Sequence, residues 1–185
     1  DQPFLVMATQ NPIEMEGTYP LPEAQLDRFL MKILVTYPNH AELNRIVERT
    51  IQPEGEFPVP VMDRESILEV RTVCRSVLVA PHVQEYAVHL VMSTQPEQSE
   101  AHELARKYIR YGSSPRGALA LVECGRVRAL MRGRFHLAME DIQHVASAVL
   151  RHRVILNFDA HADGHTPETV LTSIIKTVTA QAVVG

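Results

Sequence analysis

The sequence predicts an α/β fragment followed by an all-α helical bundle, so that the chain is mostly helical. Two observations place the α/β part first: residues 4–8 and residues 30–36 are runs dominated by apolar side chains, which is typical of strands buried on both faces of a parallel sheet. A third observation predicts the bundle. From Asp63 onward the apolar residues recur at helical spacing, without a further strand-like run.

The best domain boundary is a proline-rich stretch in the middle of the chain. Residues 52–60 contain three prolines and one glycine, a composition that interrupts regular structure. We therefore divide the chain into an α/β part over residues 1–51, a linker over residues 52–62 and a helical domain over residues 63–185.

The helices are predicted from their first residues and their apolar faces. Asn39, Asp63 and Ser114 can each accept a hydrogen bond from an amide of the following turn, and Pro81 and Pro115 suit the first helical position. The predicted helices cover residues 23–29, 40–51, 64–75, 81–94, 115–132, 140–150 and 166–180.

Apolar residues at helical spacing define the faces expected to point into the bundle. These faces comprise Ile67, Leu68 and Val70 in the helix from 64, Val83, Tyr86, Ala87, Leu90 and Val91 in the helix from 81, and Leu119, Val122, Val127 and Leu130 in the helix from 115.

Charge is distributed unevenly along the chain, although the formal net charge is only -4. Residues 1–105 carry 7 basic and 16 acidic side chains, whereas residues 106–153 carry 10 basic and 3 acidic ones. A basic region of this size favours an anionic partner. The candidates are a nucleotide, an acidic neighbouring subunit and nucleic acid.

Cysteine usage and hydropathy indicate a cytoplasmic protein. Cys74 and Cys124 lie in helical contexts without a C-x-x-C spacing, so we expect reduced core thiols. No apolar run has the roughly 18 residues of a membrane span.

Three polar residues stand out as candidate site residues. Asn11 follows the first predicted strand, where open α/β sheets bind ligands, and its amide can both donate and accept, although Asn-Pro is also a common turn. Arg28 lies in the last turn of a short helix, which suits the helix dipole. Arg116 lies near the start of a helix, where the dipole disfavours a cation by about 0.3–1 kcal/mol unless an anion is close.

The motifs around these residues resemble those of the MoxR family of AAA+ ATPases. The run ATQNPIEMEGTYPLPEAQLDRF, residues 8–29, is similar to the family signature at almost every position, and Gly112–Gly117 resembles its sensor II motif. The resemblance implies that Asn11 is the sensor I residue, that Arg28 is a catalytic arginine finger acting on a neighbouring subunit's nucleotide, and that Arg116 binds nucleotide in its own subunit.

The resemblance also implies the fold and activity of a larger protein. Residues 1–51 would be the end of a P-loop AAA+ core, and residues 63–185 the helical lid. The parent would bind ATP and Mg²⁺, assemble into a ring, hexameric by analogy, and remodel or activate partner proteins such as von Willebrand factor A-domain proteins.

One absence qualifies this expectation. The chain contains no G-x-x-x-x-G-K-[ST] phosphate loop (Walker A) and no strand ending in paired acids (Walker B). It also begins on a strand, so we expect a C-terminal fragment that is inactive alone. In the family the phosphate-loop strand lies between the two strands predicted here. Residues 4–8 and 30–35 should therefore pair unusually, swap between chains or be poorly ordered, and should not form an ordinary intramolecular sheet.

Other interpretations stay open. The chain could be a helical nucleic-acid-binding module using the arginines at 126, 128, 132 and 134, or a non-catalytic AAA+ scaffold. Asp159–His165 begins like an EF-hand loop but lacks the Glu at its twelfth position, so we predict a turn there and no metal. Gln95, where the family favours arginine, and Met139, where Thr-Pro is commoner, depart from the family pattern.

Overall fold

The computed structural model describes residues 3–10, 21–51 and 59–184. Helices dominate this part of the chain, as the sequence predicts, and one small antiparallel sheet accompanies them. In chain order the elements are α1 (Glu23–Leu26), α2 (His40–Ile51), α3 (Arg64–Ser76), α4 (Pro81–Met92), α5 (Glu103–Tyr108), β1 (Ile109–Tyr111), α6 (Pro115–Met131), α7 (Met139–Leu150), β2 (Ile155–Leu156), α8 (Phe158–Ala162) and α9 (Pro167–Val184).

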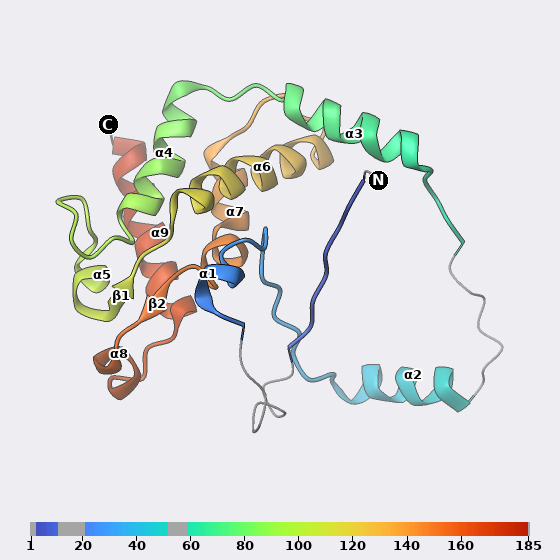
Figure 1. Cartoon of the computed structure of the whole chain (residues 1–185), viewed down its shortest axis with the longest axis horizontal. Helices are drawn as coiled ribbons and strands as arrows, with labels where there is room; N and C mark the ends of the chain where they lie inside the picture. Colours follow the sequence, from blue (N-terminus) through green and yellow to red (C-terminus); the bar gives the residue numbers. More distant parts are fainter. Residues whose placement is uncertain (1–2, 11–20, 52–58, 185) are drawn as a thin grey trace.

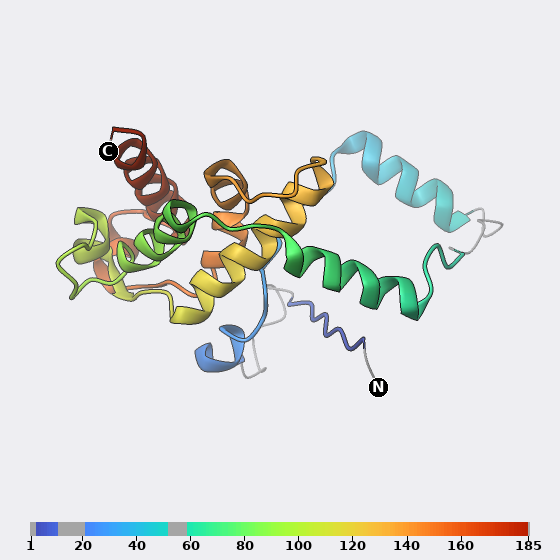
Figure 2. The same ribbon diagram turned by 90° about the horizontal axis from the view of Figure 1, so that it is seen from above.

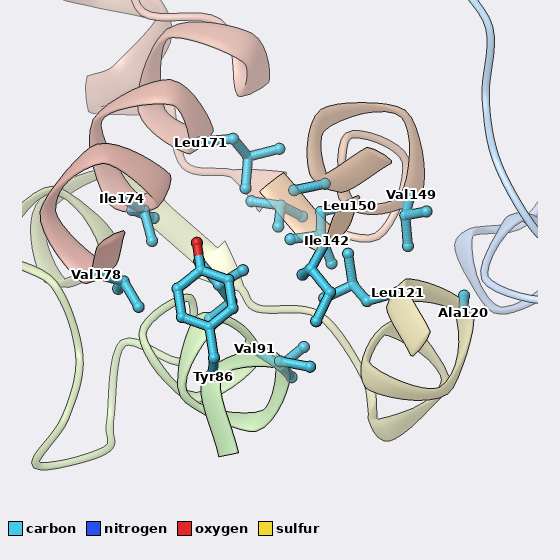
Figure 3. Packing of buried hydrophobic residues seen from close by; sticks show 14 of the residues in the cluster. Tyr86, Val91, Ala120, Leu121, Ile142, Val149, Leu150, Leu171, Ile174 and Val178 are labelled. Atoms are coloured by element: carbon cyan, nitrogen blue, oxygen red, sulfur yellow. The ribbon is translucent and has the colours of Figure 1, made fainter. Parts of the chain in front are cut away.

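The helical bundle is built around α4, α6, α7 and α9 (Figure 1). The helix α7 packs against the other three. Leu90, Leu121, Ile142, Leu150 and Leu171 are fully buried between them, and the close-up in Figure 3 shows several of these side chains converging from the different helices. This core holds the start of α6 and the end of α7 in fixed relative positions.

Two short pairings complete the bundle. The strands β1 and β2 run antiparallel, with Ile109 opposite Leu156 and an irregularity before Tyr111. Leu78, just after α3, forms an isolated parallel bridge with His136, just before α7. The sequence did not predict β1, β2, α5 or α8, because each is too short for a periodic pattern to be recognised.

The predicted helix starts are confirmed. The Asp63 carboxylate accepts a hydrogen bond from the amide of Ser66 at 2.8 Å, Asn39 accepts one from the amide of Glu42 at 3.0 Å, and Pro81 lies in the first turn of α4. The face predicted for α4 is also buried as expected. The predicted short helix at 23–29 is confirmed only over the four residues of α1, and a turn follows it.

The face predicted for α6 is confirmed only in part: Val122 and Leu130 are partly buried against the core. Leu119 and Val127 are exposed, and the helix buries mainly small residues instead: Gly117, Ala120, Leu121, Cys124, Gly125 and Ala129. The reason is close packing against neighbouring side chains. A Cβ atom built on Gly125 would lie 2.7 Å from Cδ1 of Leu137, so the packed side of α6 is the one without large side chains.

The two predicted strands are extended but belong to no sheet among the described residues. The expectation that they avoid an ordinary intramolecular sheet is confirmed, whereas the expected burial is wrong: Leu5 is 81% and Val35 92% exposed. An apolar strand is buried only when neighbouring strands and covering helices are present, and the described chain offers neither. The helices α2 and α3 likewise bury no residue, and α2 lies away from the bundle in both views (Figures 1 and 2).

Candidate functional site

The structure brings one of the three candidate residues into a polar cluster that the sequence did not predict. Arg116, the second residue of α6, forms an ion pair through Nη1 with Oδ2 of Asp27 at 2.7 Å. Arg28 follows Asp27 directly. Its side chain is exposed and forms no hydrogen bond or ion pair with the residues that the structure describes. Asn11 lies in the segment 11–20, outside the described residues.

Ser114 positions the first turn of α6. It is the N-cap, as predicted, and its hydroxyl oxygen accepts a hydrogen bond from the amide of Arg116 at 3.2 Å. The same hydroxyl lies 2.9 Å from both carboxylate oxygens of Asp27 and donates to them. One side chain thus caps the helix and fastens the carboxylate beside it.

Close packing keeps this turn in place. A Cβ atom on Gly112 would lie 2.5 Å from the carbonyl oxygen of Thr94, and a Cβ atom on Gly117 would overlap the Ser113 hydroxyl. Gln95, one of the departures from the family pattern, donates a hydrogen bond from Nε2 to the carbonyl oxygen of Ser113 at 2.6 Å. The substitution therefore supports the motif from the neighbouring loop.

The carboxylate of Asp27 is the anion that offsets the unfavourable position of Arg116 on the helix dipole. Its side chain is 14% exposed. Partial burial opposes its ionisation, but hydrogen bonds from Arg116 and Ser114 outweigh that effect and hold the pKa of the Asp27 carboxyl below its usual value. Asp27 is therefore ionised at neutral pH. It is the anion paired with Arg116 here, at the position where the family resemblance implies a nucleotide phosphate.

A second arginine, Arg153, approaches the same segment from the end of α7. Its side chain is 2% exposed, and Nε lies 3.3 Å from Oδ1 of Asp27, an ion pair without hydrogen-bond alignment. Its Nη2 donates to the carbonyl oxygens of Asp27 at 3.2 Å and Phe29 at 2.7 Å, and its Nη1 donates to that of Leu30 at 3.2 Å. Arg153 also donates to the carbonyl of Val149 in α7.

His152 adds a further contact to this segment. Its Nε2 lies 3.0 Å from the carbonyl oxygen of Phe29, and since a carbonyl only accepts, Nε2 carries the proton. Burial lowers the pKa of His152, and the nearby charges of Arg153 and Lys32 lower it further, although the bond to Phe29 acts in the opposite direction. The imidazole is therefore neutral near pH 7, and its buried Nδ1 has no hydrogen-bond partner.

Sequence reasoning missed Asp27, His152 and Arg153. The only local signal was the Arg151–His152–Arg153 triplet after a predicted helix, which the helix dipole alone explains. The partners of Arg153 in the segment around Arg28 lie more than 120 residues earlier in the chain, so no periodic pattern connects them.

The basic region is partly neutralised within the chain. Arg128 and Arg134 both pair with the buried carboxylate of Asp141, at 2.5 and 2.7 Å, whereas Arg132 is exposed. Two of the four arginines considered for nucleic acid are therefore held in an internal ion-pair cluster that joins α6 to α7.

The segment that begins like an EF-hand loop forms α8 and a turn, with Gly164 at φ +76°. Asp163 accepts a hydrogen bond from the Tyr108 hydroxyl at 2.8 Å. Within the described residues, His, Cys, Asp and Glu side chains form no group of three or more suited to a metal ion. In the same residues no helix is long and apolar enough to cross a membrane. The two cysteines are free thiols, with Cys124 buried.

Comparison with known proteins defines the class. A family model described as an AAA lid domain matches residues 101–174, and one described as an ATPase family associated with various cellular activities (AAA) matches residues 1–31. The solved structure of a candidate ATPase from Cytophaga hutchinsonii superposes with a TM-score of 0.87 at 37% identity, over 95% of this chain and 54% of that one.

Curated relatives narrow the assignment. The chain is 40% identical over 179 residues to the chaperone MoxR1 of Mycobacterium tuberculosis, and 36% identical over 180 residues to the uncharacterised protein YeaC of Bacillus subtilis. These matches cover 95% of this chain but only 46% and 52% of the relatives, so the chain spans about half their length. The chain belongs to the MoxR family of AAA+ ATPases.

Proposed function

We propose that the chain is the C-terminal part of a MoxR-type ATPase that hydrolyses ATP with Mg²⁺ in a ring and uses the energy to remodel or activate partner proteins. Residues 1–51 belong to the ATPase core, residues 52–62 to a linker and residues 63–185 to the helical lid. The relative named as a chaperone supports the remodelling role. Von Willebrand factor A-domain proteins are the class of partner that we propose, in the cytoplasm.

The roles proposed for the three residues are those implied by the resemblance of their motifs to the family's. Asn11 positions the attacking water beside the terminal phosphate, as an amide that both donates and accepts can do. Arg28 is the finger that stabilises charge on the phosphoryl group held by the next subunit, where a planar guanidinium matches phosphate oxygens better than lysine does. Arg116 senses the nucleotide of its own subunit from the first turn of α6.

The observation that carries the proposal is the different state of the two arginines. Arg116 is already bound to an anion at the start of a helix, through an ion pair of 2.7 Å. Arg28, one residue from that anion, is exposed and unengaged within the described residues. This is the arrangement expected if one arginine serves its own subunit and the other a neighbour.

The test uses the full-length protein. Arg28→Ala should leave ATP binding near normal and lower turnover by about 10³–10⁵-fold. Arg116→Ala should weaken binding or uncouple it from turnover in the same subunit. Arg132→Ala, which removes an exposed arginine beyond the end of α6, is the control and should change neither.

Normal hydrolysis by both variants would exclude these roles, whereas absence of hydrolysis by the unmodified full-length protein would favour the non-catalytic scaffold. We also propose that the 185-residue chain alone does not turn over ATP, since its sequence has no phosphate loop. Turnover by the purified chain would contradict this. Binding of DNA that weakens steeply with salt would support the nucleic-acid alternative instead.

A further inference from the structure

Residues 27–32, here called the finger segment, contain Arg28 and have little structure of their own. The preceding helix α1 has four residues, has no side-chain cap at Pro22 and buries nothing. A helix this short is not stable by itself. The backbone that carries Arg28 must therefore be held by contacts with another part of the protein.

The contacts come from the end of α7. Arg153 donates hydrogen bonds to the carbonyl oxygens of Asp27, Phe29 and Leu30, on both sides of Arg28. The amide of Lys32 donates to the carbonyl oxygen of Ala148 at 2.9 Å. The finger segment is thus fixed at its start, middle and end to the last turn of α7 and to Arg153 just beyond it.

The base of these contacts is rigid. Val149 and Leu150, beside Ala148 on α7, are fully buried in the lid core (Figure 3), and the Arg153 guanidinium is itself buried and bonded to the Val149 carbonyl. A planar group with five donors in a fixed fork can hold several carbonyls at once, whereas the point charge of a lysine cannot. The geometry of Arg153 matters here as well as its charge.

We propose that Arg153 is a positioning residue for Arg28: the lid of one subunit sets the direction of the arginine that the subunit presents to its neighbour's nucleotide. This inference rests on the finger role proposed for Arg28. It assigns to the lid a second task, besides sensing nucleotide through Arg116, that affects the adjacent active site.

The first test is Arg153→Lys in the full-length protein, which keeps the charge and loses the fork. We expect ATP affinity near that of the unmodified protein and turnover reduced by roughly 10–100-fold, as expected when a reacting group is displaced by about 1 Å. Arg151→Lys is the matched control. Arg151 lies two residues away, and within the described part of the chain its side chain contacts only Ser147 and, at 3.6 Å, Glu168. Turnover by this variant should be unchanged.

A merely structural role is separated from positioning by mixing subunits. A subunit with Arg153→Lys has a sound nucleotide site but presents a poor finger, whereas a subunit with Arg116→Ala has a poor nucleotide site and presents a sound finger. In a 1:1 mixture of the two variants, about a quarter of the interfaces pair a sound nucleotide site with a sound finger from the next subunit. Because the finger acts in trans, turnover should recover to about a quarter of that of the unmodified protein. No recovery would overturn the proposal, because the defect would then lie within the subunit's own site.

The remaining outcomes are also decisive. If Arg28→Ala is active, the proposed function fails; if it is inactive while Arg153→Lys is normal, only this inference fails. Should Arg153→Lys not fold, as judged by thermal unfolding, His152→Phe provides the second variant, since it removes only the bond to Phe29. It should lower turnover severalfold and be rescued by the same mixing; full activity or failure of rescue would overturn the proposal.

Discussion

The ion-pair cluster at Asp141 gives a stability prediction whose magnitude follows from the contacts. The carboxylate is fully buried and accepts four hydrogen bonds: from Arg128 at 2.5 Å, from Arg134 at 2.8 and 2.7 Å, and from the amide of Ala138 at 3.1 Å. Asp141→Ala leaves all four donors without this acceptor. Breaking a buried ion pair by removing one partner costs about 3–5 kcal/mol.

Partial exposure of the arginines lowers this figure. The side chain of Arg128 is 18% exposed and that of Arg134 24% exposed, so water replaces part of what is lost. We expect Asp141→Ala to reduce the free energy of unfolding by about 2–4 kcal/mol, measured by urea denaturation at pH 7. Glu140→Gln is the matched control. Glu140 pairs with the same arginines but is 66% exposed, and its removal should cost less than about 1 kcal/mol.

The pH dependence has a defined sign. Burial opposes ionisation of Asp141, but the hydrogen bonds from Arg134 and Ala138 outweigh it, so its pKa in the folded protein lies below the ordinary value of 3.8. Its contribution is therefore complete above about pH 4 and is lost as the pH falls through the lower, folded-state pKa. Equal stability of Asp141→Ala and Glu140→Gln at pH 7, or a difference that persists unchanged at pH 2, would refute the reasoning.

Two further predictions concern packing and thiol reactivity. Gly125→Ala gains about 1 kcal/mol of helix propensity but places its Cβ 2.7 Å from Cδ1 of the buried Leu137. Because overpacking costs about 1–3 kcal/mol, thermal unfolding should show a net destabilisation. A raised melting temperature would contradict this prediction. Burial raises the pKa of the Cys124 thiol to about 11. A thiol reagent at pH 8 should therefore label Cys74, which is partly exposed, well before Cys124. Equal labelling rates of the two cysteines in the native protein would be the contrary result.

The helix starts were predictable because their determinants are local. Asp63 and Ser114 each cap a helix through an amide two or three residues away, and Pro81 fixes a backbone angle that suits a first turn. Such signals operate within one turn of chain. They require no knowledge of what the helix packs against, and the assembled bundle leaves them in place.

The packed face of α6 was not predictable by the same means. The spacing of apolar residues predicts burial of Leu119 and Val127, whereas the structure buries Gly125 and Ala129. Which face of a helix packs inward depends on how closely neighbouring side chains approach it, and a hydrophobic pattern does not encode that distance. The space at Gly125 is limited by Leu137, which belongs to another part of the chain.

In the candidate site too, local features were predictable from the sequence and contacts between distant residues were not. The arginine at the start of α6 was identified from an electrostatic inconsistency, a cation on the positive end of a helix dipole, and the inference that an anion must be near it was sound. The identity of the anion was not available, because Asp27 lies 89 residues earlier in the chain. A phosphate and a carboxylate satisfy the same rule.

The presence of a carboxylate beside Arg116, where a phosphate was expected, affects how the proposed ATPase would respond to nucleotide. If Arg116 binds a phosphate in the full-length protein, it must first give up the carboxylate of Asp27 or share it. Arg153 keeps its bonds to three carbonyls in either case, because those bonds do not involve the carboxylate. The finger segment would thus remain attached to the lid while its link to the first turn of α6 changes. The state of a subunit's own nucleotide would therefore alter the surroundings of Arg28 without releasing it.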